Sequence, residues 1–182
     1  MLSIEECREL IPGEGSLSDE QVVEIRETLM GLAELGIESY IEKKRREKMK
    51  NLYLDIDGVI LTKKGVAAEH ITEFLKYVTE NFNCYWLTTH CDGNATTPFL
   101  YLVGKLPKEA VSVLEKIKPT KWKLWKPEGI DFSKDFFWLD DYAFEGDRKI
   151  LEEHQALDKL ITVDLQGNPD QLLDLLNRWK KV

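Results

Sequence analysis

The sequence predicts an α/β fold built around a central parallel sheet. From residue 51 onward, short apolar runs alternate with longer segments whose apolar residues recur every three or four positions. This alternation is typical of β-α-β units, in which each helix leads back to a parallel strand. The 182 residues suit one domain with a small appendage, and 43% are hydrophobic, which is enough for a buried core.

The first fifty residues predict an N-terminal helical extension, residues 1–50, ahead of the α/β domain at 51–182. Two pairs have the spacing of a capping box, in which each side chain binds the other's free backbone N–H: Ser3 with Glu6, and Ser18 with Gln21. We therefore expect two helices here, joined by a loop at 12–16.

The second of these helices is expected to carry one apolar stripe. Its members are spaced by three and four: Val22, Ile25, Leu29, Leu32, Ala33 and Tyr40. We expect this stripe to be buried against the main domain, another subunit or a partner protein. The basic run at 42–50 suits the C-terminal end of a helix through the macrodipole, and an alternative is a nucleic-acid patch.

The remaining elements are placed by their apolar periods and by turn residues. We expect strands at 51–56, 83–88, 110–114, 135–139 and 160–163. We expect helices at 67–80, 94–104, 121–127, 145–156 and 169–180.

Composition limits the classes of function. The net charge of −8 disfavours non-specific binding to nucleic acid, although a local basic patch at 118–126 leaves that partner open. No apolar run has the length of a membrane span, so we expect no membrane partner and a cytoplasmic location. The three cysteines lack the spacing of a disulfide framework or zinc site.

Polar side chains lie at the ends of three of the predicted strands. Asp55 and Asp57 lie at the end of the first, and because side chains two apart on a strand point to one side, they can converge. Gly58 then permits a tight turn or a close approach to a ligand. Thr88 and Thr89 end the second strand, and Asp140 and Asp141 end the fourth. Three lysines lie between these motifs: Lys121, Lys123 and Lys126.

These residues favour a magnesium site. In an open parallel sheet, ligands bind beyond the carboxyl ends of the strands. Several carboxylates crowded there would repel one another unless a cation lay among them. Oxygen ligands without histidine or cysteine partners suit Mg²⁺, with substrate phosphate completing its shell. One aspartate could then attack phosphorus while its neighbour protonates the leaving oxygen.

The order of these motifs resembles the haloacid dehalogenase (HAD) superfamily over residues 51–165. The four matching segments are "YLDIDGV", "YWLTT", a lysine and "FFWLDD". The resemblance implies a HAD-like Rossmannoid three-layer sandwich and a Mg²⁺-dependent phosphatase that forms an aspartyl-phosphate. The second aspartate of D-x-D accompanies phosphoryl transfer in this superfamily.

The resemblance also implies a role for each residue. Asp55 would be the nucleophile and a metal ligand, and Asp57 the general acid and base, with its backbone carbonyl on the metal. Thr88 would bind the phosphoryl group, with Thr89 as the alternative. Lys126, rather than Lys121 or Lys123, would balance the phosphate charge. Asp140 and Asp141 would complete the metal site.

The expected enzyme has a minimal cap or none, because about thirty residues separate Asp57 from Thr88. An open site suits a large phosphorylated substrate, a nucleotide or a nucleic-acid end. Alternatively, another subunit or the N-terminal helices cover the site. The alternative is a regulatory or protein-binding HAD-like module with weak activity, which uses those helices to bind a partner or to form a homo-oligomer.

Three local features keep two interpretations each. His90 could contact substrate or occupy the loop after the strand. Trp122 and Trp125 could stack on bases, although core packing is favoured. Asp147 lies just beyond the fourth motif and could support the site from behind.

Overall fold

A computed structural model describes residues 2–11 and 17–181. The chain divides into two compact units, Met1–Lys48 and Met49–Val182, and each is described by itself. The expected loop at 12–16 lies outside the described residues. No helix in the described parts of the chain is both long and apolar enough to cross a membrane.

The larger unit contains a five-stranded sheet in which every pairing is parallel, as predicted. The strand order is β3-β2-β1-β4-β5. The strands are β1 (Asn51–Leu54), β2 (Asn83–Trp86), β3 (Lys118–Pro119), β4 (Phe136–Asp140) and β5 (Leu160–Thr162). The register places Leu54 beside Trp86 on one side and Leu139 on the other, so these three strands end at nearly the same level.

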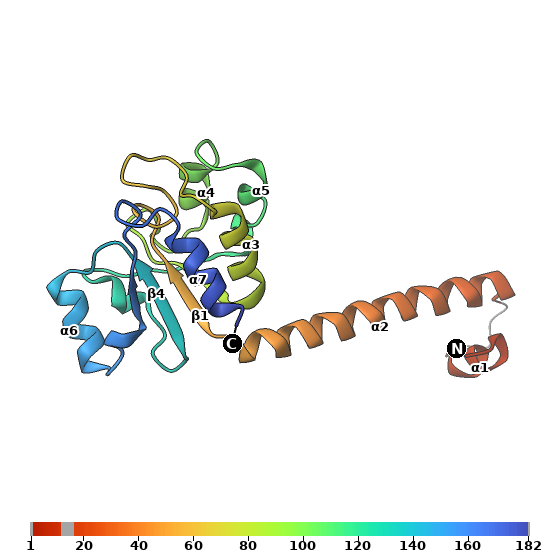
Figure 1. Cartoon of the computed structure of the whole chain (residues 1–182). Coiled ribbons are helices and arrows are strands. Elements are labelled where there is room, and N and C mark those ends of the chain that lie inside the picture. The colour runs from red at the N-terminus through yellow and green to blue at the C-terminus, as the bar shows by residue number, and fades with distance from the viewer. Residues whose placement is uncertain (1, 12–16, 182) are drawn as a thin grey trace. The chain divides into compact units, whose positions relative to one another are not determined.

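Helices cover both faces of this sheet (Figure 1). One face packs against α3 (Ile71–Asn81), α4 (Thr96–Leu102), α5 (Lys108–Val111) and α7 (Gln171–Trp179). The opposite face packs against α6 (Glu145–Glu153). Alternation along β1 explains the two cores, since Leu52 and Leu54 belong to the first and Tyr53 to the second. The chain is therefore an α/β protein with helices on both sides of a parallel sheet.

The strand expected at 110–114 is wrong. This segment forms α5 and the 3₁₀ helix η1 (Leu114–Lys116), and the strand itself comes later, at β3. Ala110, Val113 and Leu114 are all buried and stand three and four apart, so they share one face of a helical path. A short apolar run of this kind fits either structure by its period alone.

The helix expected at 121–127 is also wrong over most of its length. The segment turns irregularly and reaches only the 3₁₀ helix η2 (Lys126–Gly129). The Glu128 carboxylate accepts the backbone N–H groups of Lys123 and Trp125, at 2.9 and 3.2 Å. These bonds compete with a helical ladder, so the chain stays in a turn. A third 3₁₀ helix, η3 (Leu157–Lys159), precedes β5.

The described residues of the smaller unit form two helices, α1 (Ile4–Leu10) and α2 (Asp19–Lys48). Both predicted capping boxes are present, in the Ser3–Glu6 pair and in the Ser18–Gln21 pair. The predicted stripe is not buried along its length. Val22 is buried, whereas Leu29, Leu32 and Tyr40 are each about 60% exposed.

The connections near the β1 and β2 ends are short. Residues 55–70, all described, form a turn closed by isolated bridges of Leu61 with Asp57 and with Ala67, and then lead into α3. The described residues between β2 and β3 hold only α4, α5 and η1. These two connections, all of whose residues are described, therefore contain no separate domain.

Candidate functional site

The candidate site lies where the strand order changes direction. The chain moves from β1 outward to β2 and β3, and then returns to the other side of β1 with β4. Helices on opposite faces leave a crevice at such a point, beyond the carboxyl ends of the strands. Asp55 directly follows β1, and Asp140 is the last residue of β4. Both carboxylates therefore stand at the crevice.

Lys126 joins these two carboxylates. Its Nζ lies 2.8 Å from Asp55 Oδ2 and 2.7 Å from Asp140 Oδ2. The Lys126 side chain is 12% exposed and the Asp140 side chain 1% exposed, so water screens this network little. Of the three lysines considered, Lys126 alone reaches the cluster among the described contacts. Lys121 pairs instead with Asp92 on the surface.

Neighbouring donors fix the orientation of the carboxylates. Asp140 Oδ2 accepts the indole N–H of Trp138 at 3.1 Å, and Oδ1 accepts the backbone N–H of Tyr142 at 3.1 Å. Asp55 Oδ1 accepts the backbone N–H of Ile56 at 2.8 Å. Because buried polar groups are costly unless paired, these bonds hold each carboxylate in one position.

Burial and mutual repulsion perturb the cluster. Burial, followed by the neighbouring Asp55 carboxylate, raises the pKa of Asp140 to about 7, even though Lys126 opposes the shift. Burial alone would lower the pKa of Lys126, but Asp55 and Asp140 outweigh it and raise that pKa above its usual value. The ammonium is therefore firmly held, and the cluster still lacks enough positive charge to ionise Asp140 readily.

A third carboxylate, Asp141, completes a group with the donor set of a hard cation. Asp55, Asp140 and Asp141 each offer an oxygen, and these oxygens lie within 4.8 Å of one another. Three carboxylates against one buried lysine leave an excess of negative charge that a divalent cation would balance. The residues fit Mg²⁺, which prefers a few carboxylates and completes its shell with water or phosphate.

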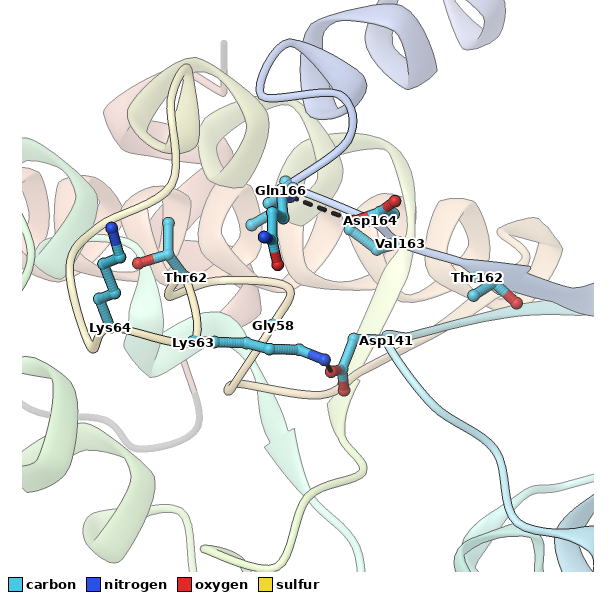
Figure 2. Close-up of a pocket in the computed structure, with 10 residues that line it drawn as sticks. Gly58, Thr62, Lys63, Lys64, Asp141, Thr162, Val163, Asp164 and Gln166 are labelled. Atoms are coloured by element: carbon cyan, nitrogen blue, oxygen red, sulfur yellow. Dashed lines mark hydrogen bonds and ion pairs between the residues drawn. The ribbon is translucent and has the colours of Figure 1, made fainter.

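Asp141 also lines a pocket of about 520 Å³ beside the cluster (Figure 2). In Figure 2, Lys63 reaches across from the turn after β1, and its Nζ lies 3.1 Å from Asp141 Oδ2. Asp164 and Gln166 form the far wall, where Asp164 Oδ1 accepts the Gln166 backbone N–H at 3.2 Å. Lys63 is an exposed cation beside the cluster that the sequence motifs did not identify.

Gly58 allows the turn after β1 and the Asp141 carboxylate to fit together. Its φ of +85° favours glycine, and a Cβ placed there would stand 2.4 Å from Asp141 Cγ. The glycine therefore has a packing role next to Asp141.

Asp57 makes contacts different from those of Asp55. Asp57 Oδ2 lies 2.7 Å from His90 Nε2, and Oδ1 accepts the Tyr101 hydroxyl at 3.1 Å. The His90 and Tyr101 rings stack with their centroids 3.9 Å apart. Asp55 and Asp57 therefore have different described partners, and because β1 ends at Leu54, the strand alternation from which their convergence was predicted does not extend to Asp57.

The two threonines differ sharply. Thr88 is fully buried, and its Oγ1 accepts the His90 backbone N–H at 3.4 Å, whereas Thr89 is exposed. Neither has a described hydrogen bond to Asp55, Asp140 or Lys126. Thr88 thus supports the loop that presents His90.

Other expected residues lie close by or belong to the core. Asp147 is buried and accepts the Lys126 backbone N–H at 3.0 Å, and burial raises its pKa. It therefore fixes the chain at the lysine. Trp122 packs against the core cluster on the α6 side, and Trp125 lies against Gly146.

Sequence reasoning missed Tyr101 as a partner of Asp57. The two residues are 44 positions apart, and "FLYL" on α4 is an ordinary apolar helix segment. No local pattern marks its hydroxyl as part of a polar site, so only the packing of α4 beside the sheet edge identifies it.

Fold and site together define an α/β protein with a lysine-bridged acidic cluster at the switch point of a parallel sheet. No protein-family model, curated protein or solved structure matches the chain.

Proposed function

We propose that the protein is a Mg²⁺-dependent phosphatase that works through an aspartyl-phosphate on Asp55, as its resemblance to the HAD superfamily implies. The observation that carries the proposal is the Lys126 ammonium held between Asp55 and Asp140, with Asp141 beside them. This arrangement provides a carboxylate nucleophile, a fixed cation and an oxygen set for a metal in one crevice.

Asp55 is the group that attacks phosphorus. Its carboxylate is 10% exposed and oriented by Ile56 N–H and by Lys126, so little motion is needed to reach a bound phosphate. The bond to the leaving oxygen breaks as the Asp55 oxygen bonds to phosphorus. Bound Mg²⁺, held by Asp55, Asp140 and Asp141, would supply charge stabilisation for the phosphoryl oxygens.

Asp57 manages the proton in this scheme. It donates a proton to the leaving oxygen, and then takes one from the water that hydrolyses the aspartyl-phosphate. Its side chain is 49% exposed, so it is accessible to substrate, and His90 with Tyr101 holds its direction. In this proposal Asp55 is the nucleophile and Asp57 the general acid and base, and their different contacts suit these different roles.

The test is hydrolysis of an aryl phosphate with and without Mg²⁺. Asp55→Asn should abolish Mg²⁺-dependent release of phosphate, while Asp158→Asn should leave it unchanged. Asp158 is an exposed carboxylate in η3, which directly precedes β5 and so lies at the amino ends of the strands, opposite the carboxyl ends where the site lies. Full activity in the Asp55→Asn variant would rule out the mechanism.

A further inference from the structure

We propose that α2 pairs in antiparallel fashion with α2 of a second copy of this chain. The proposal is independent of the phosphatase chemistry. It rests on the exposed apolar side of this helix and on the separation of charge along it.

The apolar side of α2 is largely uncovered. Of the described residues of this helix, Val22 is the buried one. α1 packs along the first part and lines with it an apolar groove of about 260 Å³. Five further side chains are each about 60% exposed or more: Leu32, Leu35, Ile37, Tyr40 and Ile41. Contiguous apolar surface of this kind marks an interaction site.

Most of these residues share one side of the helix. At 100° per residue, Leu29, Leu32, Ile37, Tyr40 and Ile41 fall on the same half as Val22. Glu20, Glu24, Glu34 and Glu38 fall on the other half. At about 1.5 Å per residue, the 30-residue helix offers a stripe long enough for a paired helix.

Charge identifies the second copy as the partner. The first nine residues of α2 hold four acidic side chains and one basic, whereas its last six hold five basic and one acidic. A copy turned end to end brings the acidic start of each helix to the basic end of the other. A parallel copy brings like charges together. The separation of charge along α2 therefore favours a copy related by a two-fold rotation, as in an isologous dimer, over a parallel copy.

The first experiment measures the mass of the full chain by light scattering at low ionic strength. We expect twice the 21.1 kDa of the monomer. Ile37→Glu with Ile41→Glu should yield monomer, while Glu34→Gln with Glu38→Gln on the polar side should remain dimeric. Circular dichroism checks that each variant keeps its helices. A monomeric wild-type chain would overturn the proposal, as would a dimer indifferent to Ile37→Glu with Ile41→Glu.

The second experiment tests charge and direction. Reversing Lys43, Lys44, Arg45 and Arg46 to Glu in one chain, and Glu20, Glu24 and Glu27 to Lys in another, should give two monomers that form a heterodimer when mixed. For direction, a spin label at Glu20→Cys in one chain should lie closer to a label at Arg45→Cys in the other chain than to a second Glu20→Cys label, because an antiparallel pair brings these two positions to the same level along the helices. Shorter distances between like labels would show parallel pairing and overturn the proposal. A wild-type monomer whose Ile37→Glu variant changes amide exchange in residues 49–182 would show docking within one chain instead.

Discussion

Lys126 is the residue whose removal should affect the candidate site most. Asp55 and Asp140 are each within 2.8 Å of its Nζ and are almost fully buried. Lys126→Met leaves these carboxylates without their cation, and we expect a loss of about 3 kcal/mol in the free energy of unfolding, measured with urea in EDTA. Lys121→Met, which removes an exposed pair with Asp92, should change it by less than about 0.5 kcal/mol. Equal losses in the two variants would contradict the buried network.

Asp140 should make metal binding depend on pH. Its folded pKa of about 7 lies above the ordinary 3.8, so the stability it contributes is full below the ordinary pKa and is lost as pH rises through about 7. Mg²⁺ needs the ionised carboxylate and competes with the proton. The rise in Tm caused by Mg²⁺ should therefore be larger at about pH 8 than at about pH 6. An equal rise at both values would refute this expectation, and Asp140→Asn should remove most of the effect.

Tyr101 should affect catalysis by orienting the Asp57 carboxylate. Tyr101→Phe removes the hydroxyl that donates to Asp57 Oδ1. We expect kcat for an alkyl phosphate to fall by up to about 100-fold, and kcat for an aryl phosphate to change little, because a good leaving group needs no proton. Tyr77→Phe on α3 is the matched control, since its ring contacts Lys180 and packs, partly buried, against the core cluster on the α3 side of the sheet. Equal losses for both substrates would indicate a general structural defect.

The turn after β1 is the element on which the position of the Asp141 carboxylate depends. Gly58→Ala introduces a Cβ against Asp141 at a φ of +85°. We expect destabilisation of more than about 1 kcal/mol, with loss of the Mg²⁺-induced rise in Tm, because Asp141 must move. Gly65→Ala in the same turn has a φ of +73° but open space around its Cβ, so it should be strained yet retain the rise. Retention of the rise in both variants would separate Asp141 from metal binding.

Some secondary-structure elements could be predicted from the sequence and others could not. The strands that carry Asp55 and Asp140 follow from their apolar runs, and both N-terminal capping boxes follow from local spacing. The segment 110–127 was predicted wrongly at two points, because its apolar period was ambiguous and because the Glu128 carboxylate holds a turn. The strands and capping boxes depend on interactions between residues close in sequence, whereas the structure of 110–127 depends on contacts that its periodic pattern does not reveal.

At the scale of the molecule, residues 49–182 should fold without the N-terminal helices. Both hydrophobic cores lie entirely within this unit, and so do all members of the acidic cluster. We expect the fragment to unfold cooperatively with a Tm close to that of the larger unit in the full chain, as read by tryptophan fluorescence, since all five tryptophans lie in it. A fragment without a cooperative transition would show that the N-terminal unit stabilises the sheet.

The sequence alone determined the parallel α/β architecture, the acidic pairs at two strand ends and the short connections between them. It could do so because strand period, helix period and capping act over a few residues. Only the tertiary structure decided that Lys126 joins Asp55 to Asp140 across 71 and 14 positions, and that Asp57 turns instead to His90 and Tyr101. Those contacts depend on which strand ends and loops lie next to one another, and this is determined by the order of the strands on either side of β1.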